Sequence, residues 1–311
     1  MTPNALQRFV ADELQQPVAD EVRAFATHLA ATGKGAAAVL FYGSNLRSGA
    51  LDGVLDFYLL VDDLHAWHGH HLAALANRWL PPNVSYCEWQ HAGHTLRAKL
   101  AVLTVQQFHA GMAGEGIDTT LWARFAQPAG LLWARDARAR DAAITAVSAA
   151  VCGAARWAAQ LGPPQGGSTD YWDALFARTY AAELRVEKAE RAYSLAAHAP
   201  QRYATALRLA WAAAGIAWDE ITPAIVRPAV ADHQRQQATV AWARRARWGK
   251  ALNLLRLVKS AWTFTGGADY LAWKVERHSG VKIKLSDWQR KHPILAAPYL
   301  LWRLKTLGAI R

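Results

Sequence analysis

Cysteine is nearly absent from this sequence of 311 residues, which contains only Cys87 and Cys152. Two cysteines exclude a disulfide scaffold and a cysteine-rich zinc module, so we expect no disulfide partner and a reducing compartment. The first residues, MTPNALQRFV, lack the basic and apolar regions of a signal peptide. The most apolar long stretch, 142–161, is mostly alanine and contains Arg156. Alanine drives membrane insertion weakly, and we therefore expect a packed helix here and a cytoplasmic protein that is soluble or peripheral to a membrane.

Acidic residues are scarce in the last quarter of the chain. From residue 240 onward 15 Lys and Arg face three acids, a net charge of +12, whereas 20 basic and 21 acidic residues leave the first 239 residues at −1. A segment this basic indicates a polyanionic partner, either nucleic acid or an anionic membrane surface. Tryptophans accompany the charge, at Trp248, Trp262, Trp273, Trp288 and Trp302. Aromatic and basic residues together suit a lipid headgroup boundary, although the same mixture can stack RNA bases or form a solvated helical face.

Hydrophobic residues make up 52% of the chain and charged residues 19%, enough for a sizeable core and about two domains. The apolar spacing predicts an α+β fold, with strands in the first half and helices afterwards. We expect strands at 37–42, 54–61, 84–90, 95–103 and 130–134, the third and fourth forming a hairpin around Ala92-Gly93. We expect helices at 4–33, 138–161, 169–197, 201–214, 231–260 and 268–278. The Gly-Pro-Pro-Gln-Gly-Gly stretch at 162–167 is the clearest linker.

Two short segments carry the chemical signal. The first is Phe41-Tyr-Gly-Ser-Asn-Leu, and the second is Leu55-Asp-Phe-Tyr-Leu-Leu-Val-Asp-Asp63. A strand that leads through Gly43-Ser44 into a helix offers backbone N–H groups and a hydroxyl to a phosphate. A second strand with one acid, Asp56, can hold a divalent metal beside that phosphate. Gly-Ser followed by a strand-borne acid is typical of the nucleotidyltransferase superfamily related to DNA polymerase β.

The second strand departs from that superfamily in one respect. Its members usually carry a second acid two residues after the first, so that both carboxylates share the metal from one face. Here that position is Tyr58. Asp62 lies on the same face, but six residues at about 3.3 Å each place it roughly 20 Å away. The second metal ligand must therefore come from elsewhere.

The single acid on this strand and the residues that flank it resemble a narrower family. Tyr42-Gly43-Ser44, Leu55-Asp56-Phe57, Val61-Asp62-Asp63 and Trp67-His68 follow one another as in the mitochondrial-type phosphatidate cytidylyltransferases. These are peripheral CDP-diacylglycerol synthases, also described as translocator assembly and maintenance proteins. Weaker blocks resemble further family segments, namely Lys99 in a strand, Arg124-Phe-Ala-Gln-Pro128, Leu175-Phe176, Thr179-Tyr-Ala-Ala-Glu183-Leu-Arg185, Lys259-Ser260 and Thr263 to Gly267. Asn45 stands where the family usually has Gly, and Glu183 where it has Asp.

The resemblance implies a polymerase β-like mixed sheet and a set of site residues. Asp56 would be catalytic as a Mg²⁺ ligand, and Glu183 would supply the second metal-binding carboxylate or pair with Arg185. Lys99 would stabilise developing charge. Tyr42, Gly43, Ser44 and Arg124 would bind the nucleotide. His65, His68, His70 and His71 lack the Cys or carboxylate partners of a zinc site, so we expect no zinc there.

The implied reaction joins CTP and phosphatidic acid to give CDP-diacylglycerol and pyrophosphate. The implied domains are a nucleotidyltransferase domain at 1–137, a helical domain completing the active-site cleft at 138–239, and a basic, Trp-rich helical region at 240–311. We expect the last region to contact the inner face of the cell membrane through Lys282, Lys284, Arg290 and Lys291. Two alternatives remain: a nucleotidyltransferase of the same fold acting on RNA, protein or a small molecule, and a catalytically silent basic protein that binds membrane or RNA.

Overall fold

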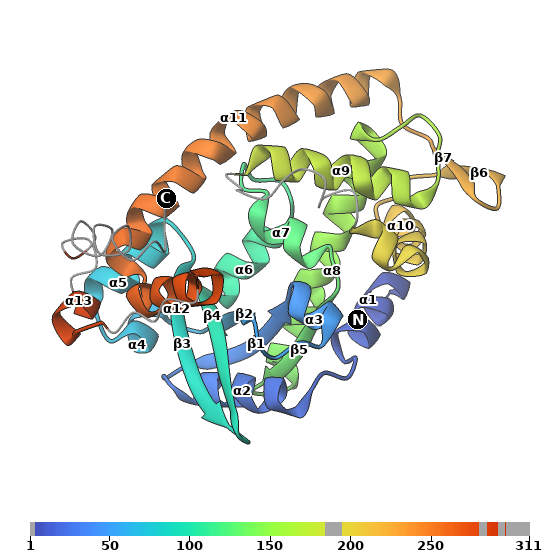
Figure 1. Ribbon diagram of the computed structural model, residues 1–311. Helices are drawn as coiled ribbons and strands as arrows, with labels where there is room; N and C mark the ends of the chain where they lie inside the picture. Colours follow the sequence, from blue (N-terminus) through green and yellow to red (C-terminus); the bar gives the residue numbers. More distant parts are fainter. Residues whose placement is uncertain (1–3, 184–194, 280–284, 292–295, 297–311) are drawn as a thin grey trace.

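A five-stranded mixed sheet organises the first half of the protein. The computed structural model describes residues 4–183, 195–279, 285–291 and 296 (Figure 1). The strands are β1 (Ala36–Tyr42), β2 (Val54–Val61), β3 (Asn83–His91), β4 (His94–Thr104) and β5 (Ala129–Ala134), in the spatial order β3-β4-β2-β1-β5. Strand β2 pairs with β4 in parallel, and the other pairs are antiparallel. The predicted α+β class is confirmed, and all five predicted strands form.

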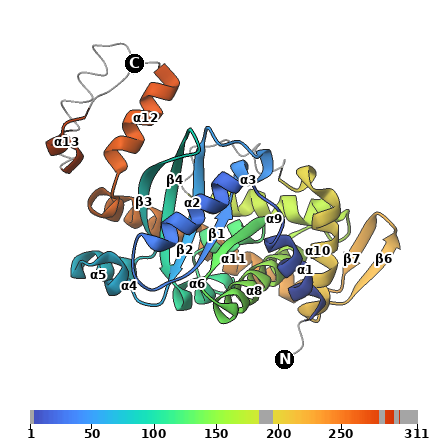
Figure 2. The same ribbon diagram turned by 90° about the horizontal axis from the view of Figure 1, so that it is seen from below.

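The two faces of the sheet are separated by the alternation of side chains along each strand. One face, which includes Val39, Phe41 and Phe57, packs on α2 (Asp20–Ala31) in one buried cluster. The opposite face, which includes Leu40, Tyr58 and Leu103, packs in a second cluster with residues of α1 (Ala5–Leu14), α6 (Val105–Met112), α7 (Thr120–Phe125) and α8 (Ala137–Leu161). Figure 2 shows α2 and α8 separated by the sheet.

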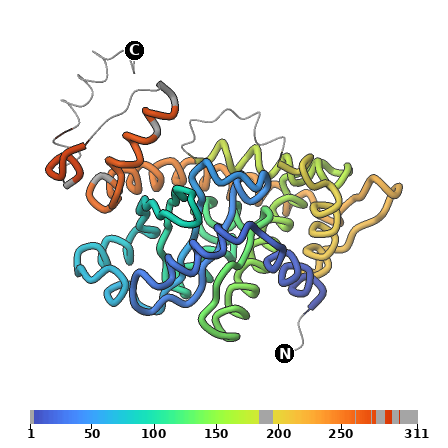
Figure 3. The backbone as a smooth tube through the Cα atoms, turned by 60° about the horizontal axis from the view of Figure 1, so that its bottom comes forward, coloured from blue at the N-terminus to red at the C-terminus, as the bar shows by residue number. Residues whose placement is uncertain are grey.

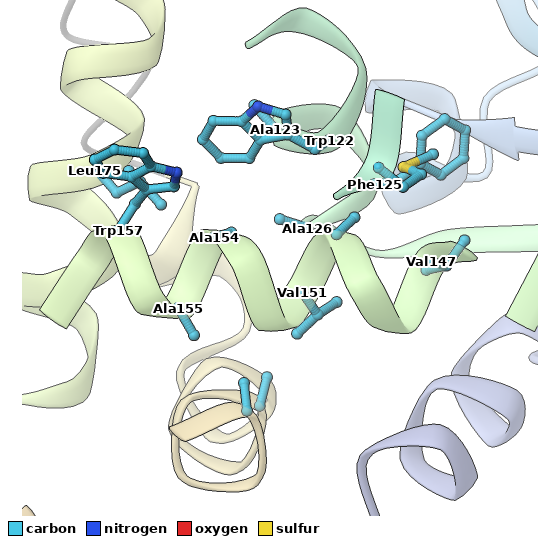
Figure 4. Close-up of a cluster of buried hydrophobic side chains, with 14 of the residues drawn as sticks. Trp122, Ala123, Phe125, Ala126, Val147, Val151, Ala154, Ala155, Trp157 and Leu175 are labelled. Carbon is cyan, nitrogen blue, oxygen red and sulfur yellow. The ribbon is translucent and has the colours of Figure 1, made fainter. Parts of the chain in front are cut away.

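Helix α8 forms the centre of the larger core. Small residues line it, so that neighbouring helices approach closely and large side chains such as Trp122, Trp157 and Leu175 fill the space around it (Figure 4). By length and composition alone, α8 could cross a membrane, yet 67% of its most apolar window is buried inside the protein. The predicted packed helix therefore forms.

The second half of the chain is mostly helical. Its elements are α9 (Ser168–Ala182), the short turn η2 (Ala196–His198), α10 (Pro200–Ala213), the hairpin β6 (Trp218–Thr222) and β7 (Ile225–Pro228), α11 (Asp232–Thr263), α12 (Gly267–Ser279) and α13 (Asp287–Lys291). The long helix α11 spans the molecule from the β6–β7 hairpin to α12 (Figure 1). Figure 3 shows α12 and α13 at the end of the molecule farthest from that hairpin.

Several predicted boundaries need correction. The predicted helix at 4–33 is two helices, because Pro17 lacks a backbone N–H and disfavours helical geometry in the residue before it. The predicted helix at 169–197 ends at Ala182. The β6–β7 hairpin was not predicted; its residues are largely exposed and lack a clear apolar alternation. Helix α11 runs without a break through residues 239 and 240, between the second and third predicted domains, and the division into domains stays a prediction.

Four shorter helices complete the described structure. They are α3 (Ser44–Ser48), α4 (Leu64–His68), α5 (His71–Trp79) and the already mentioned α7. The predicted hairpin around Ala92-Gly93 forms between β3 and β4, and both residues have positive φ angles, 48° and 80°. This geometry is the one that matches a two-residue turn to the twist of the strands it joins.

Candidate active site

The site begins with one row of side chains across the sheet. Tyr42 of β1 pairs with Asp56 of β2, and Asp56 pairs with Lys99 of β4. Residues at paired positions on neighbouring strands point to the same face. The fold therefore brings together three residues that the sequence reading had selected separately.

Gly43 follows Tyr42 directly and brings the Gly-Ser turn against Asp56. Its φ of 99° lies in a region that residues other than glycine rarely adopt. A Cβ atom at this position would lie 3.3 Å from Asp56 Oδ2. Ser44 begins α3, which has only five residues. Ser44 is exposed, and its Oγ donates to Asn45 Oδ1 at 3.4 Å. The proximity of the turn to Asp56 is thus structural fact, while phosphate binding by Gly43 and Ser44 stays a prediction.

A cavity of about 460 Å³ lies over this row. Tyr42, Asp56, Lys99 and Arg124, all predicted site residues, line it. Tyr58 and Thr120 contribute to the same side, and α11 and α12 close the opposite side. The lining residues from these two helices and their junction are Asn253, Arg256, Lys259, Ser260, Thr263, Phe264 and Tyr270. Four of the lining residues are cations and one is an acid, so the cavity suits an anionic ligand.

Asp56 is the acid of the cavity. Burial raises the pKa of its carboxyl, and the charges of Lys99 and Arg124 oppose that rise. A carboxylate in such a position gains from any further cation that enters the cavity. The residue therefore has the properties of a metal ligand or of an acid–base group.

Arg124 extends from α7 and is partly buried. Its Nη1 donates to the Thr120 carbonyl at 3.0 Å and to the Tyr58 hydroxyl at 3.4 Å. Burial acts to lower the pKa of Arg124, but the surrounding groups, Glu183 and Asp118 among them, hold it well above its ordinary value. Arg124 is therefore a permanent positive charge whose hydrogen bonds go to neutral groups.

Two cavity residues of α11 were not selected as site residues from the sequence. Arg256 donates to the Pro81 carbonyl at 2.8 Å and to Asp118 Oδ2 at 2.6 Å. Lys259 donates to the carbonyls of Leu80 and Pro82, both at 2.6 Å, and to Asn83 Oδ1 at 2.9 Å. Both cations thereby fasten α11 to the segment before β3.

A signal for this inward face was present in the sequence. Asn253, Arg256, Ser260 and Thr263 recur every three or four residues, which places them on one side of a helix, with leucines between them. The net charge of the region counts basic residues on every face of the helix and therefore favoured a membrane surface. The helical spacing of the same residues distinguishes a polar face, which lines the cavity, from an apolar face, which is exposed.

Glu183 ends α9 and is only 7% exposed. It lies close enough to Arg124 to raise the pKa of the guanidinium. It is not one of the residues that line the cavity. Within the described residues, no group of three or more His, Cys, Asp or Glu side chains is arranged to hold a metal ion. A role for Glu183 as second metal ligand stays a prediction, and its partner in the alternative, Arg185, lies outside the described residues.

Two other predicted features lie away from the cavity. Asp62 pairs with Arg135 and lines different cavities, in keeping with its expected distance from Asp56. In the histidine segment, the ring of His68 contacts Asn77 Nδ2 at 3.0 Å, and burial lowers its pKa. His65 and His71 face one another with ring centroids 6.0 Å apart.

The four residues predicted to contact the membrane are only partly described. Lys282 and Lys284 lie outside the described residues, and the side chain of Lys291 is likewise not described. Arg290 is exposed but pairs with Asp269 and Asp287. Their membrane role stays a prediction.

Comparison with known proteins gives little beyond the site itself. No protein-family model matches the chain, and no curated protein matches it in sequence. Among solved structures, the chain is similar to a nucleotidyltransferase-like protein from Exiguobacterium sibiricum 255-15, with 11% sequence identity and a TM-score of 0.27. The similarity covers 83% of this chain and 79% of that one. A likeness at this level carries no functional argument.

Proposed function

We propose that this protein is a Mg²⁺-dependent nucleotidyltransferase that transfers the cytidylyl group of CTP to phosphatidic acid. The observation that carries the proposal is a half-buried carboxylate, Asp56, set between Lys99 and Arg124 in a cavity whose lining is otherwise cationic or neutral. A nucleoside triphosphate brings several negative charges, and a cavity of this kind offsets them. The short Tyr-Gly-Ser and Leu-Asp-Phe segments support the same reading.

The residues of the chain have distinct tasks in this proposal. Lys99 and Arg124 bind phosphate oxygens and stabilise the charge that develops as the α-phosphate is transferred. Tyr42 and the Gly43-Ser44 turn hold the triphosphate beside Asp56. An acceptor phosphate is already an anion, so no side-chain nucleophile is required. Catalysis would rest on positioning and charge stabilisation.

A magnesium ion can be bound here by one protein carboxylate together with oxygens of the substrate and of water. Protein sites often bind Mg²⁺ through one or two carboxylates and complete the coordination with substrate phosphates and water. Asp56 would be the carboxylate. When bound, the metal would neutralise phosphate charge and polarise the reacting phosphoryl group.

A lipid acceptor is supported by the outward face of α11. Exposed basic residues, Arg244, Arg247 and Lys250, precede exposed apolar ones on the same side of the helix. These apolar residues are Leu254, Leu255, Leu257, Val258 and Trp262, of which Trp262 is 75% exposed. Leu72 and Trp79 of α5, which contacts α11, are also exposed. We name the face formed by the eight residues of α11 the outer face.

The outer face matches the chemistry of an anionic bilayer. Cationic side chains attract anionic headgroups at roughly 1 kcal/mol each, and the leucines and Trp262 can enter the headgroup boundary. The opposite side of the same helix lines the cavity. A membrane on the outer face would therefore lie one helix away from the site, which suits a peripheral enzyme with a lipid substrate. The proposed location is accordingly the inner face of the cell membrane.

The second candidate is a nucleotidyltransferase of the same fold that acts on RNA. It is favoured by the +12 charge beyond residue 240. The apolar part of the outer face argues against it, because backbone contacts to nucleic acid come mainly from Lys, Arg and small polar groups.

One assay separates these candidates. Purified protein is given Mg²⁺ and labelled CTP, ATP, GTP or UTP, together with phosphatidic acid vesicles, RNA or neither. We expect label in CDP-diacylglycerol only, and from CTP in preference to the other nucleotides. Label transferred to RNA would support the second candidate, and no transfer to any acceptor would contradict the enzyme proposal.

A further inference from the structure

Lys99 and Asp56 are placed where an ion pair is expected. They occupy paired positions on the parallel strands β2 and β4, on the same face of the sheet. Side chains at such positions start about 5 Å apart. The partial burial of Asp56 strengthens its attraction to a nearby ammonium. Nevertheless, Lys99 forms no ion pair with Asp56 or with any other described acid.

The ammonium of Lys99 is bound to a residue 171 positions later in the chain. Its Nζ donates to the Tyr270 hydroxyl at 2.9 Å, and lies 4.2 Å from the centroid of the Tyr270 ring. Tyr270 thus offers the cation both an oxygen acceptor and a π face. Both contacts are to neutral groups, so neither forms an ion pair with the ammonium.

Tyr270 itself is held in place by its surroundings. Its ring packs against Phe264, Tyr86 and Trp273, with centroids 5.4 to 6.3 Å apart. The chain before α12 is joined to the edge of the sheet, where Tyr86 N donates to the Thr265 carbonyl at 2.8 Å. At Gly266 a Cβ would lie 2.3 Å from the Tyr86 carbonyl oxygen, so only glycine permits this contact.

We infer that Tyr270 is a positioning residue that keeps Lys99 from pairing with Asp56. A contact ion pair would neutralise both groups and remove from the cavity the cation and the carboxylate that the proposed function needs. A cation bound to a neutral hydroxyl can exchange that partner for a phosphate oxygen at little electrostatic cost. The inference rests on the proposed function only for the class of ligand, a polyphosphate.

The test uses inorganic pyrophosphate, the full-length protein and EDTA, so that neither metal nor transfer activity enters the measurement. Binding is measured by calorimetry for wild type, Tyr270→Leu, Asp56→Asn and the double variant. We expect Tyr270→Leu to weaken binding about fivefold, because Lys99 turns to Asp56. Asp56→Asn removes a repulsive charge and should tighten binding in either background, but about fivefold more in the Tyr270→Leu background, where it also releases Lys99.

Two further variants separate positioning from structure. Tyr270→Phe keeps the ring and removes the hydroxyl, and should bind pyrophosphate with an affinity between those of wild type and Tyr270→Leu. Leu271→Ala changes an exposed neighbour on the same helix and should bind as wild type does. Thermal melting of each variant reports any loss of folding.

The inference is overturned if Asp56→Asn changes affinity by the same factor in both backgrounds, since Tyr270 would then contact the ligand or support the fold without acting through Lys99. It is also overturned if wild-type protein does not bind pyrophosphate. Failure of cytidylyl transfer alone would leave the thermodynamic cycle intact and would count against the proposed function only.

Discussion

The two sides of the cavity carry the same number of cations but use them differently. On the sheet side, Lys99 and Arg124 donate to tyrosine hydroxyls and one carbonyl. On the α11 side, Arg256 binds the carboxylate of Asp118, and Lys259 donates to three oxygens of residues 80–83, where β3 begins. In our proposal the first pair binds the ligand, whereas the second pair holds a long helix in place. Position in the cavity alone does not make a cation a ligand-binding group.

The largest effect is expected at the acid that both sides surround. Asp56→Asn should lower nucleotidyl transfer by at least about a hundredfold, because the amide cannot supply the charge that holds a metal. Because the pKa of Asp56 is raised in the folded protein, folding favours the protonated carboxyl. Ionisation of Asp56 therefore lowers the free energy of unfolding as the pH rises through that pKa. The variant should therefore melt at the wild-type temperature or slightly higher. Asp62→Asn is the matched control, and a larger loss there would show that the site is misplaced.

The comparison predicts a second effect on ligand affinity. Lys99→Met and Arg124→Met should each weaken CTP binding by about ten- to a hundredfold, the range expected when a charged hydrogen bond is lost. Lys250→Met, on the exposed side of α11, removes the same charge and should leave CTP affinity within about twofold. Equal losses of CTP affinity in all three variants would mean that the net positive charge of the protein, and not contacts in the cavity, attracts the nucleotide.

Substitutions on the α11 side of the cavity should lower the free energy of unfolding. Arg256→Met leaves Asp118 without its cation and should destabilise the protein by about 1–3 kcal/mol at pH 7. Burial alone would raise the pKa of Asp118, but its contact with Arg256 holds it below the ordinary 3.8. That stabilisation is present above pH 3.8 and is lost as the pH falls through the lowered pKa. Denaturant melts from pH 7 to 3 should show the wild type and the variant converging. A variant of full stability that no longer binds CTP would assign Arg256 to the ligand.

Much of the sheet side could be predicted from sequence, and the reason is local. Tyr42, Asp56 and Lys99 lie on apolar strands whose ends are marked by turns, so strand assignment nearly fixes which face each side chain occupies. The α11 side depends on packing over more than 130 residues of sequence, from Asp118 to Arg256. No local pattern in either segment specifies that contact. The net charge of residues 240–311 does not distinguish Arg256 and Lys259, which face the cavity, from the exposed basic residues of the same helix.

A fourth prediction concerns the opposite side of the same helix. Leu257→Ser with Trp262→Ser should weaken binding to vesicles containing anionic phospholipid by about tenfold, since exposed apolar groups would no longer enter the headgroup boundary. Transfer to a soluble short-chain phosphatidic acid should change less than about twofold. A separate variant, Leu72→Ser with Trp79→Ser on α5, tests whether α5 shares the surface. Co-sedimentation at low and high salt gives the affinities, and wild-type protein that stays in the supernatant would contradict a lipid role for the outer face.

The smallest effect separates two roles for Glu183. If this residue acts on the site only by supporting the charge of Arg124, Glu183→Gln should weaken CTP binding by about two- to threefold, as expected for an electrostatic contact that does not involve the ligand directly. Its effect should be the same for CTP alone and for CTP with Mn²⁺, because no metal ligand has been lost. If Glu183 is the second carboxylate of the metal site, the loss should appear only when Mn²⁺ is present, and it should approach the loss seen for Asp56→Asn. Titrations of CTP with and without Mn²⁺ against both variants decide between these roles, because a contact through Arg124 and a bond to the metal differ in which ligand they stabilise.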